Sequence, residues 1–187
     1  RVLDEAGYVL GSDGVRAKGD LRLEFRLQFP SSLSAYARMA DMMADWFKQA
    51  GMKANPEAMD EDSLIAVTTA VGDYDLALWS WEPDPDPDFI LSVLTTDQFL
   101  EGGWSDSGYH NPEYDQLYLD QQQLVDRTAR QQAIWKMQEL IFNDIPYVVL
   151  VYEDMLQAYR SDRFTGFIES PLGIESTQSL LNVEPVR

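Results

Sequence analysis

The residues best suited to chemistry in this 187-residue chain form an acidic, proline-rich loop at positions 82–88. Prolines alternate there with Glu82, Asp84, Asp86 and Asp88, and each proline holds the neighbouring backbone extended. Strand geometry then predicts that the three aspartates point the same way, about 6–7 Å apart. Carboxylates fixed in this way suit an ammonium group or a metal ion. The alternative is a solvated loop in which Asp86 or Asp88 begins the following helix.

Other chemistries find less support in the sequence. Glu82 with one loop aspartate would suit a carboxylate-dependent hydrolase, but acid pairs are common in a chain with 32 acidic residues. His110 is the only histidine, so a multi-histidine metal site is excluded and a Ser-His-Asp triad would depend on this residue alone. We interpret His110 as a loop residue. The turn-like Ser12-Asp13-Gly14 and the acidic loop both lack the EF-hand pattern.

Tryptophans flank the acidic loop and the polar, glycine-rich stretch that follows it. Trp81 and Trp104 could stack on a ligand or complete the core, and both interpretations stay open. Trp79 lies within an apolar run and is expected in the core. Trp46 and Trp135 fall on the apolar stripes of two predicted helices, so we expect both to be buried.

Composition narrows the class of protein. The chain has 14 basic and 32 acidic residues, giving a net charge of −18, which opposes binding to nucleic acid or anionic lipid. Absence of cysteine excludes disulfides and thiolate metal sites, and no apolar run approaches the ~20 residues that span a bilayer. One domain over residues 1–187 is expected. Residues 1–7 look like a helix closed by glycine, and the first residue is not Met, which suggests a piece of a longer protein.

The first half of the sequence predicts a repeating order of strand and helix. The predicted strands are 21–29, 52–59 and 75–81, and the predicted helices are 33–50, with a serine cap, and 63–71. This order is typical of right-handed βαβ units, so we expect an α/β fold with a largely parallel central sheet flanked by helices. The acidic loop follows the third strand, at the edge where such sheets bind ligands.

The second half predicts two helices and a last strand. One helix begins at Pro112, another covers 128–142, and Pro146 ends the helical region. The run Tyr147–Tyr152 predicts a strand, which 156–160 would join as a hairpin through a turn at Glu153. Residues 164–187 predict loops with short strands.

Several ordered blocks resemble the C-terminal lobe of the extracytoplasmic solute-binding proteins of the peptide/nickel-binding family, which feed ABC importers. No block is specific alone, but their order extends over nearly the whole chain. The blocks are Leu3 to Tyr8 with Asp13 to Arg16, Gly72 to Ala77 with Trp79 and Pro85 to Asp88, the Tyr-x-Asn-Pro-x-x-Asp pattern from Tyr109 to Asp115 within 104–115, and residues 146–152 and 159–167.

The resemblance implies a two-lobed protein that clamps its ligand between lobes, with residues 1–187 as the C-terminal ligand-binding lobe and the N-terminal lobe and signal peptide absent. Peptide binders of the family use an acid after the Trp79-type position to hold the α-ammonium group of the peptide. Asp84 and Glu82 both match that place, and we prefer Asp84. The other expected ligand-binding residues are Trp81, Trp104, Asp86 and Tyr109. No cofactor and no metal site are expected.

The function implied by the resemblance is capture of small peptides and delivery to an ABC importer by hinge closure, without catalysis. The partners would be the ligand, the membrane permease and the N-terminal lobe, and the location extracytoplasmic, in a bacterial periplasm or as a surface lipoprotein. Binding of an oligosaccharide or a metal chelate is the alternative within the family. A carboxylate-dependent hydrolase and a structural adhesion domain are the alternatives from other classes.

Overall fold

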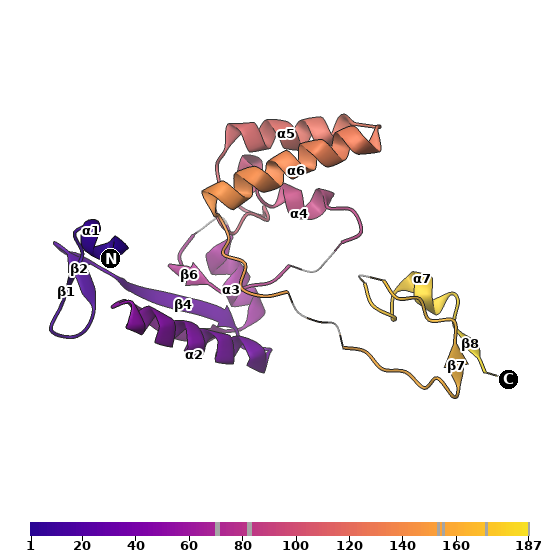
Figure 1. Cartoon of the computed structure of the whole chain (residues 1–187), viewed down its shortest axis with the longest axis horizontal. Helices are drawn as coiled ribbons and strands as arrows, with labels where there is room; N and C mark the ends of the chain where they lie inside the picture. Colours follow the sequence, from indigo (N-terminus) through magenta and orange to yellow (C-terminus); the bar gives the residue numbers. More distant parts are fainter. Residues whose placement is uncertain (70–71, 82–83, 153, 155, 171, 187) are drawn as a thin grey trace. The chain divides into compact units, whose positions relative to one another are not determined.

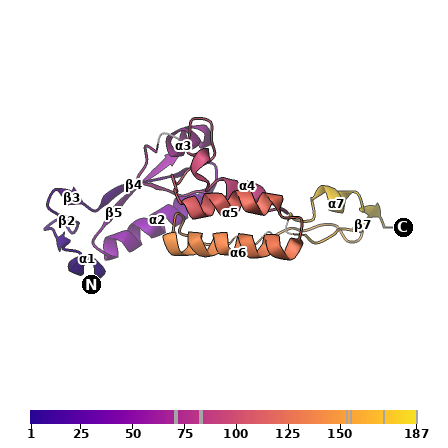
Figure 2. The same ribbon diagram turned by 90° about the horizontal axis from the view of Figure 1, so that it is seen from above.

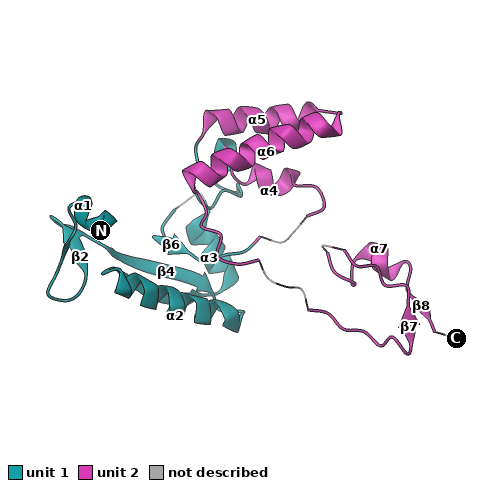
Figure 3. Ribbon diagram, viewed as in Figure 1, with its two compact units in different colours: residues 1–80, 96–110 teal, residues 81–95, 111–187 magenta. Residues whose placement is uncertain are grey.

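The structure, a computed structural model, describes residues 1–69, 72–81, 84–152, 154, 156–170 and 172–186 (Figure 1). The chain divides into two compact units (Figure 3). The first comprises Arg1–Ser80 and Thr96–His110, and the second comprises Trp81–Thr95 and Asn111–Arg187.

The first unit contains the predicted parallel sheet. Strand β4 (Glu24–Pro30) lies between β5 (Lys53–Met59) and β6 (Leu76–Ala77), and both neighbours run parallel to it. The α/β fold with a parallel sheet flanked by helices is therefore confirmed. The third strand is much shorter than the predicted 75–81, because it pairs with β4 over two residues alone.

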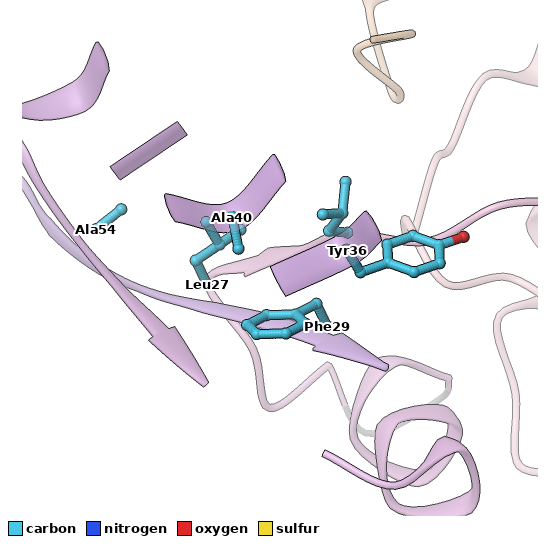
Figure 4. Close-up of a cluster of buried hydrophobic side chains, with 6 residues drawn as sticks. Leu27, Phe29, Tyr36, Ala40 and Ala54 are labelled. Carbon is cyan, nitrogen blue, oxygen red and sulfur yellow. The ribbon is translucent and has the colours of Figure 1, made fainter. Parts of the chain in front are cut away.

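The core of this unit lies between β4 and helix α2 (Ser34–Gln49), and Figure 4 shows the buried hydrophobic side chains that form it. Leu27 and Ala40 are fully buried there, and Phe29 and Tyr36 nearly so. The alternating pattern of 21–29 predicts polar residues on a solvated face, but Gln28 is buried and Leu21 is exposed. The central position of β4 explains the first difference, since helix α3 (Glu61–Thr68) contacts the same strand.

Most of the predicted helix ends are set by a capping side chain or by a glycine. The Asp60 side chain accepts the Ser63 N–H at 3.0 Å and caps α3, and Gly51, with φ 76°, ends α2. The predicted serine cap of α2 is wrong, because Leu33 occupies the cap position without a side-chain bond. Trp46 on α2 is exposed rather than buried, since the helix packs on the sheet through the face that carries Tyr36 and Ala40.

The N-terminal segment forms a small antiparallel sheet that the sequence patterns do not predict. Its strands are β1 (Val9–Leu10), β2 (Arg16–Lys18) and β3 (Leu21–Arg22). Helix α1 (Val2–Glu5) precedes it and ends as predicted at Gly7, whose φ is 86°. The Tyr8 N–H donates to the Leu3 carbonyl and the Gly7 N–H to the Asp4 carbonyl, which is the Schellman pattern.

The second unit is built on a pair of helices. Helices α5 (Pro112–Gln123) and α6 (Arg127–Asp144) lie side by side (Figures 1 and 2), and α4 (Asp88–Ser92) contacts α5. Asn111 and Asp126 cap the two long helices. Tyr114 and Met137 are fully buried between these elements, whereas Trp135 is exposed, contrary to the prediction.

The predicted strand Tyr147–Tyr152 is wrong, because the segment is irregular and pairs with no described strand. A hairpin with 156–160 is likewise not formed by the described residues, and Glu153 lies outside them. The tail forms strands β7 (Phe164–Thr165) and β8 (Glu184–Pro185), which pair antiparallel, and helix α7 (Thr177–Leu180). A short 3-10 helix, Thr96–Gln98, belongs to the first unit. Within the described ranges, no helix has the length and apolar character needed to cross a membrane.

Candidate functional site

The acidic loop begins the second unit. Trp81 is half-buried and its indole meets the Phe89 ring edge-on, with ring centroids 5.9 Å apart. Glu82 lies outside the described residues. Asp84 is exposed, and no hydrogen bond or ion pair joins it to another described residue. The loop therefore presents the Asp84 carboxylate to solvent beside an anchored tryptophan.

Asp86 is held by an arginine from α6. Arg130 Nη1 donates to Asp86 Oδ2 and Nη2 to Oδ1, both at 2.7 Å, which is the bidentate geometry of strong guanidinium–carboxylate pairs. The Asp88 N–H also donates to Asp86 Oδ1 at 2.9 Å. The bonds from Arg130, followed by the backbone bond, lower the pKa of Asp86 to about 2. Asp86 is thus a carboxylate at any physiological pH.

Asp88 belongs to the same network. Gln121, fully buried on α5, donates from Nε2 to Asp88 Oδ1 at 2.7 Å and accepts from Arg130 Nε at 2.8 Å. The Gln122 amide and the Tyr118 hydroxyl also approach the Asp88 carboxylate. Side chains from α5 and α6 therefore fix the second half of the loop.

This geometry corrects one expectation about the loop. The three aspartates were expected to point the same way from an extended backbone, but Pro87 is helical, with φ −74° and ψ 0°, and Asp88 is the first residue of α4. The alternative, that the aspartates begin a helix, describes Asp86 better, because its carboxylate accepts the first helical N–H. Asp84 and Asp86 thus have different surroundings despite their identical sequence context.

Sequence reasoning missed Arg130 and Gln121. One signal was available, because the 14 basic residues are outnumbered by 32 acidic ones. An arginine inside a helix is therefore a natural ion-pair partner for a fixed carboxylate. The glutamine carried no signal, because its burial depends on how α5 packs. A shallow hollow opens over this network, lined by Asp86, Asp88, Gln122, Leu124 and Arg130.

Two other expected ligand-binding residues, Trp104 and Tyr109, belong to the first unit. The Trp104 side chain is exposed, and the backbone N–H of Trp104 donates to Gln98 Oε1 at 3.3 Å. The Tyr109 N–H donates to Ser107 Oγ at 3.3 Å. Nearby, the Tyr74 hydroxyl donates to the Asp106 carbonyl, which ties this loop to the segment before β6.

His110 lies in the same loop, as interpreted from the sequence. Its Nδ1 lies 2.9 Å from Thr96 Oγ1. No cluster of three potential metal-ligating side chains is found in the described ranges. Carboxyl groups paired with arginine, such as Asp75 beside Arg26 and Asp86 beside Arg130, have lowered pKa values. A carboxylate hydrolase needs one acid whose pKa is raised, so these groups suit ion pairing instead.

Comparison with known proteins identifies similar chains. The family described as bacterial extracellular solute-binding proteins, family 5 (middle region), matches residues 1–100. Protein XP55 of Streptomyces lividans is 28% identical over 188 residues, which cover 96% of this chain and 32% of that protein.

Two solved structures share the fold. The oligopeptide-binding protein AppA of Bacillus subtilis, in complex with a nonapeptide, is 21% identical with a TM-score of 0.69, over 78% of this chain and 29% of AppA. A periplasmic oligopeptide-binding protein of Thermotoga maritima, with bound mannohexaose, is 17% identical with a TM-score of 0.74, over 98% of this chain and 38% of that one. The chain thus spans about a third of the length of the relatives it matches.

Proposed function

Because this chain belongs to the bacterial extracellular solute-binding proteins of family 5, which matches more than half of it, we propose that it forms the ligand-capturing lobe of a protein that delivers peptides to an ABC importer. The family binds solutes and is not enzymatic. Residues 1–187 would be one lobe, acting with a second lobe and with a membrane permease. Its place of action would be outside the cytoplasm, in a periplasm or at the cell surface, on a lipid anchor in the latter case.

One observation carries the peptide assignment. Asp84 is an exposed carboxylate with no partner among the described residues, while Asp86, two residues on, is fixed by Arg130. An anchored loop that displays an unpaired carboxylate suits an ammonium group, whose charge it would neutralise. Closure of a second lobe would remove water and strengthen that pair. Asp84, or Glu82 in the other register, would bind the peptide α-ammonium, and Asp86 would keep the loop in place.

Aromatic residues would provide further contacts with the ligand. Trp81 stands at the start of the loop, and Trp104 and Tyr109 lie on the glycine-rich segment of the first unit. Each remains a predicted ligand contact within its own unit, because flat amphipathic rings pack on peptide backbone and side chains without strict sequence preference.

The experiment is to purify the full-length natural gene product without refolding, denature it, and identify the released small molecules by mass spectrometry. A mixture of short peptides is the expected result. Asp84→Asn should then weaken peptide binding about tenfold or more, equivalent to about 1.4 kcal/mol. Asp41→Asn, which changes an exposed aspartate on α2, is the matched control and should bind normally. Release of no small molecule, together with normal peptide binding by Asp84→Asn and Glu82→Gln, would overturn the assignment.

A second candidate ligand is an oligosaccharide or, as the resemblance allows, a metal chelate. The exposed indole of Trp104 favours the sugar, since aromatic faces stack on sugar rings, and a protein of the same fold holds mannohexaose. A single sugar in the mass spectrum would support this candidate, and Trp104→Ala would then weaken binding more than Asp84→Asn.

A further inference from the structure

A buried glutamine connects the acidic loop to both long helices of the second unit. Gln121 on α5 is fully buried, and both ends of its side-chain amide are hydrogen-bonded. Its Nε2 donates to Asp88 Oδ1 at 2.7 Å, and its Oε1 accepts from Arg130 Nε at 2.8 Å. Such an amide is held rigidly, because a rotation would leave a buried polar group without a partner at a cost of about 1–3 kcal/mol.

The bond to Gln121 fixes the direction of the Arg130 guanidinium. While Nε donates to Gln121, the outer nitrogens Nη1 and Nη2 face Asp86, and both donate to its carboxylate at 2.7 Å. The guanidinium is a planar, rigid fork, so a bond that fixes Nε also restrains the two outer nitrogens. The Arg130 side chain is 28% exposed, and an arginine on a surface has many other rotamers unless its own contacts restrain it.

This restraint matters because a second carboxylate lies within reach of the arginine. Asp84 precedes Asp86 by two residues, so their Cα atoms are at most about 7 Å apart. Among the described residues, Asp84 has no ion-pair partner, and Arg130 is the only cation that an ion pair brings to the acidic loop. An arginine released from Gln121 could pair with Asp84 and would then compete with a ligand for that carboxylate.

We propose that Gln121 is a positioning residue that holds the Arg130 guanidinium away from Asp84. The carboxylate of Asp84 thereby stays free for a cationic ligand. The inference rests on the proposed capture of an ammonium group by Asp84 and adds the residue that keeps this carboxylate available. Within the described structure Gln121 bonds to neither Asp84 nor Asp86, so it acts on both through the arginine.

Titration of Asp86 tests the positioning without any ligand. Gln121→Met removes the donor and the acceptor at nearly constant volume, and it should raise the pKa of Asp86 from about 2 toward 3.8. Carbon-13 NMR of the aspartate-labelled full-length natural gene product measures the change, with the Asp86 signal assigned as the one that Asp86→Asn removes. An unchanged pKa of Asp86 in Gln121→Met would overturn the proposal, whatever the loss of stability.

A second variant covers the case in which Gln121→Met does not fold. Gln121→Asn keeps an amide at the position but is one methylene too short to reach both partners. It should also raise the pKa of Asp86, and an unchanged pKa in this folded variant would overturn the proposal in the same way.

The neighbouring glutamine provides a matched control. Gln122→Met makes the same change one residue along α5, at an exposed side chain that within the described structure bonds to Asp88 but not to Arg130. It should leave the pKa of Asp86 near 2. A rise of that pKa in Gln122→Met as large as in Gln121→Met would assign the effect to the bonds of Asp88 and overturn the proposal.

Binding of a defined peptide tests the consequence for the ligand. The probe is trialanine, titrated by calorimetry into the full-length product after bound solute has been removed. Gln121→Met should weaken its binding about tenfold, because the released Arg130 competes for Asp84. N-acetyl-trialanine lacks the ammonium group, so the wild type and the variant should bind it equally. An equal loss for both peptides would overturn the proposal.

A double variant shows whether the competitor is the arginine. In the Arg130→Gln background no guanidinium is present, so adding Gln121→Met should weaken trialanine binding by less than about twofold. A tenfold loss in this background as well would mean that Gln121 acts by another route, and would overturn the proposal.

The outcome is separable from that of the ligand proposal. A wild type that binds neither trialanine nor its acetylated form would count against the peptide assignment alone, because the titration of Asp86 still decides the role of Gln121. Trialanine binding that depends on Asp84, together with an unchanged pKa of Asp86 in Gln121→Met, would refute the positioning role alone.

Discussion

At the scale of single residues, the ion pair between Asp86 and Arg130 holds the second half of the acidic loop in place. Both guanidinium nitrogens Nη1 and Nη2 donate to the carboxylate at 2.7 Å, and the pKa of Asp86 is lowered to about 2. A lowered pKa means that folding favours the ionised form. The pair therefore contributes fully above the ordinary pKa near 3.8 and is lost as the pH falls through about 2.

We predict that Arg130→Gln raises the pKa of Asp86 from about 2 toward 3.8, because the main donor to the carboxylate is removed. Carboxyl titration by NMR measures the change. The free energy of unfolding at neutral pH should fall by about 1–3 kcal/mol, because the oxygen of the buried Gln121 side chain loses its donor as well.

Arg127→Gln is the matched control, since Arg127 lies exposed at the start of the same helix and is not a donor to Asp86. It should leave the pKa of Asp86 unchanged. An Asp86 that titrates alike in the wild type and in Arg130→Gln would contradict the assigned cause.

At the scale of elements, the cap of α5 explains one of the sequence blocks in physical terms. Asn111 Oδ1 accepts the N–H groups of Glu113 at 3.0 Å and Tyr114 at 3.2 Å, and Pro112 occupies the first helical turn, where no N–H is needed. The Asn111 amide also donates to Asp144 of α6 at 2.9 Å. The Asn-Pro pair therefore starts α5 and links it to its neighbour.

We predict that Asn111→Ala destabilises the protein by about 1–2 kcal/mol, because two helical N–H groups lose their acceptor. Urea unfolding measures the loss. Asn111→Ser keeps a cap acceptor and loses the bond to Asp144, so it should be the milder variant. Equal losses in the two variants would show that the cap does not carry the effect.

At the scale of the whole molecule, the proposed function makes this chain one half of a binding arrangement. Its net charge of −18 favours cationic over anionic ligands, but one exposed carboxylate in water binds an ammonium weakly. Enclosure by a second lobe is what would make such a pair strong, since the effective dielectric constant falls when water leaves.

We predict that the 187-residue chain alone binds short peptides with a dissociation constant of about 1 mM or weaker, measured by titration calorimetry. The full-length product should bind them far more tightly. Tight binding by the 187-residue chain alone would show that enclosure by a second lobe is unnecessary.

The sequence predicted a structural feature correctly where that feature depends on residues near one another in the chain. Alternation and helical periodicity predicted β4, α2, β5, α3, α5 and α6, because the backbone preference of each segment matches the element that it forms. The same patterns failed where neighbours decide the outcome. Trp46 and Trp135 lie on apolar stripes yet are exposed, since the stripe is wider than the surface that each helix covers in this chain.

The sequence by itself determined the parallel α/β order, the acidic loop with its alternating prolines, and the blocks that indicate the family, all of which are properties of residues near one another in the chain. The tertiary structure alone distinguished Asp86 from Asp84, because Arg130 lies 44 residues away in sequence and meets just one of them. It also showed Tyr147–Tyr152 as a strand sequence without a strand. A β-strand has no hydrogen bonds of its own, so its formation depends on a partner that local sequence cannot supply.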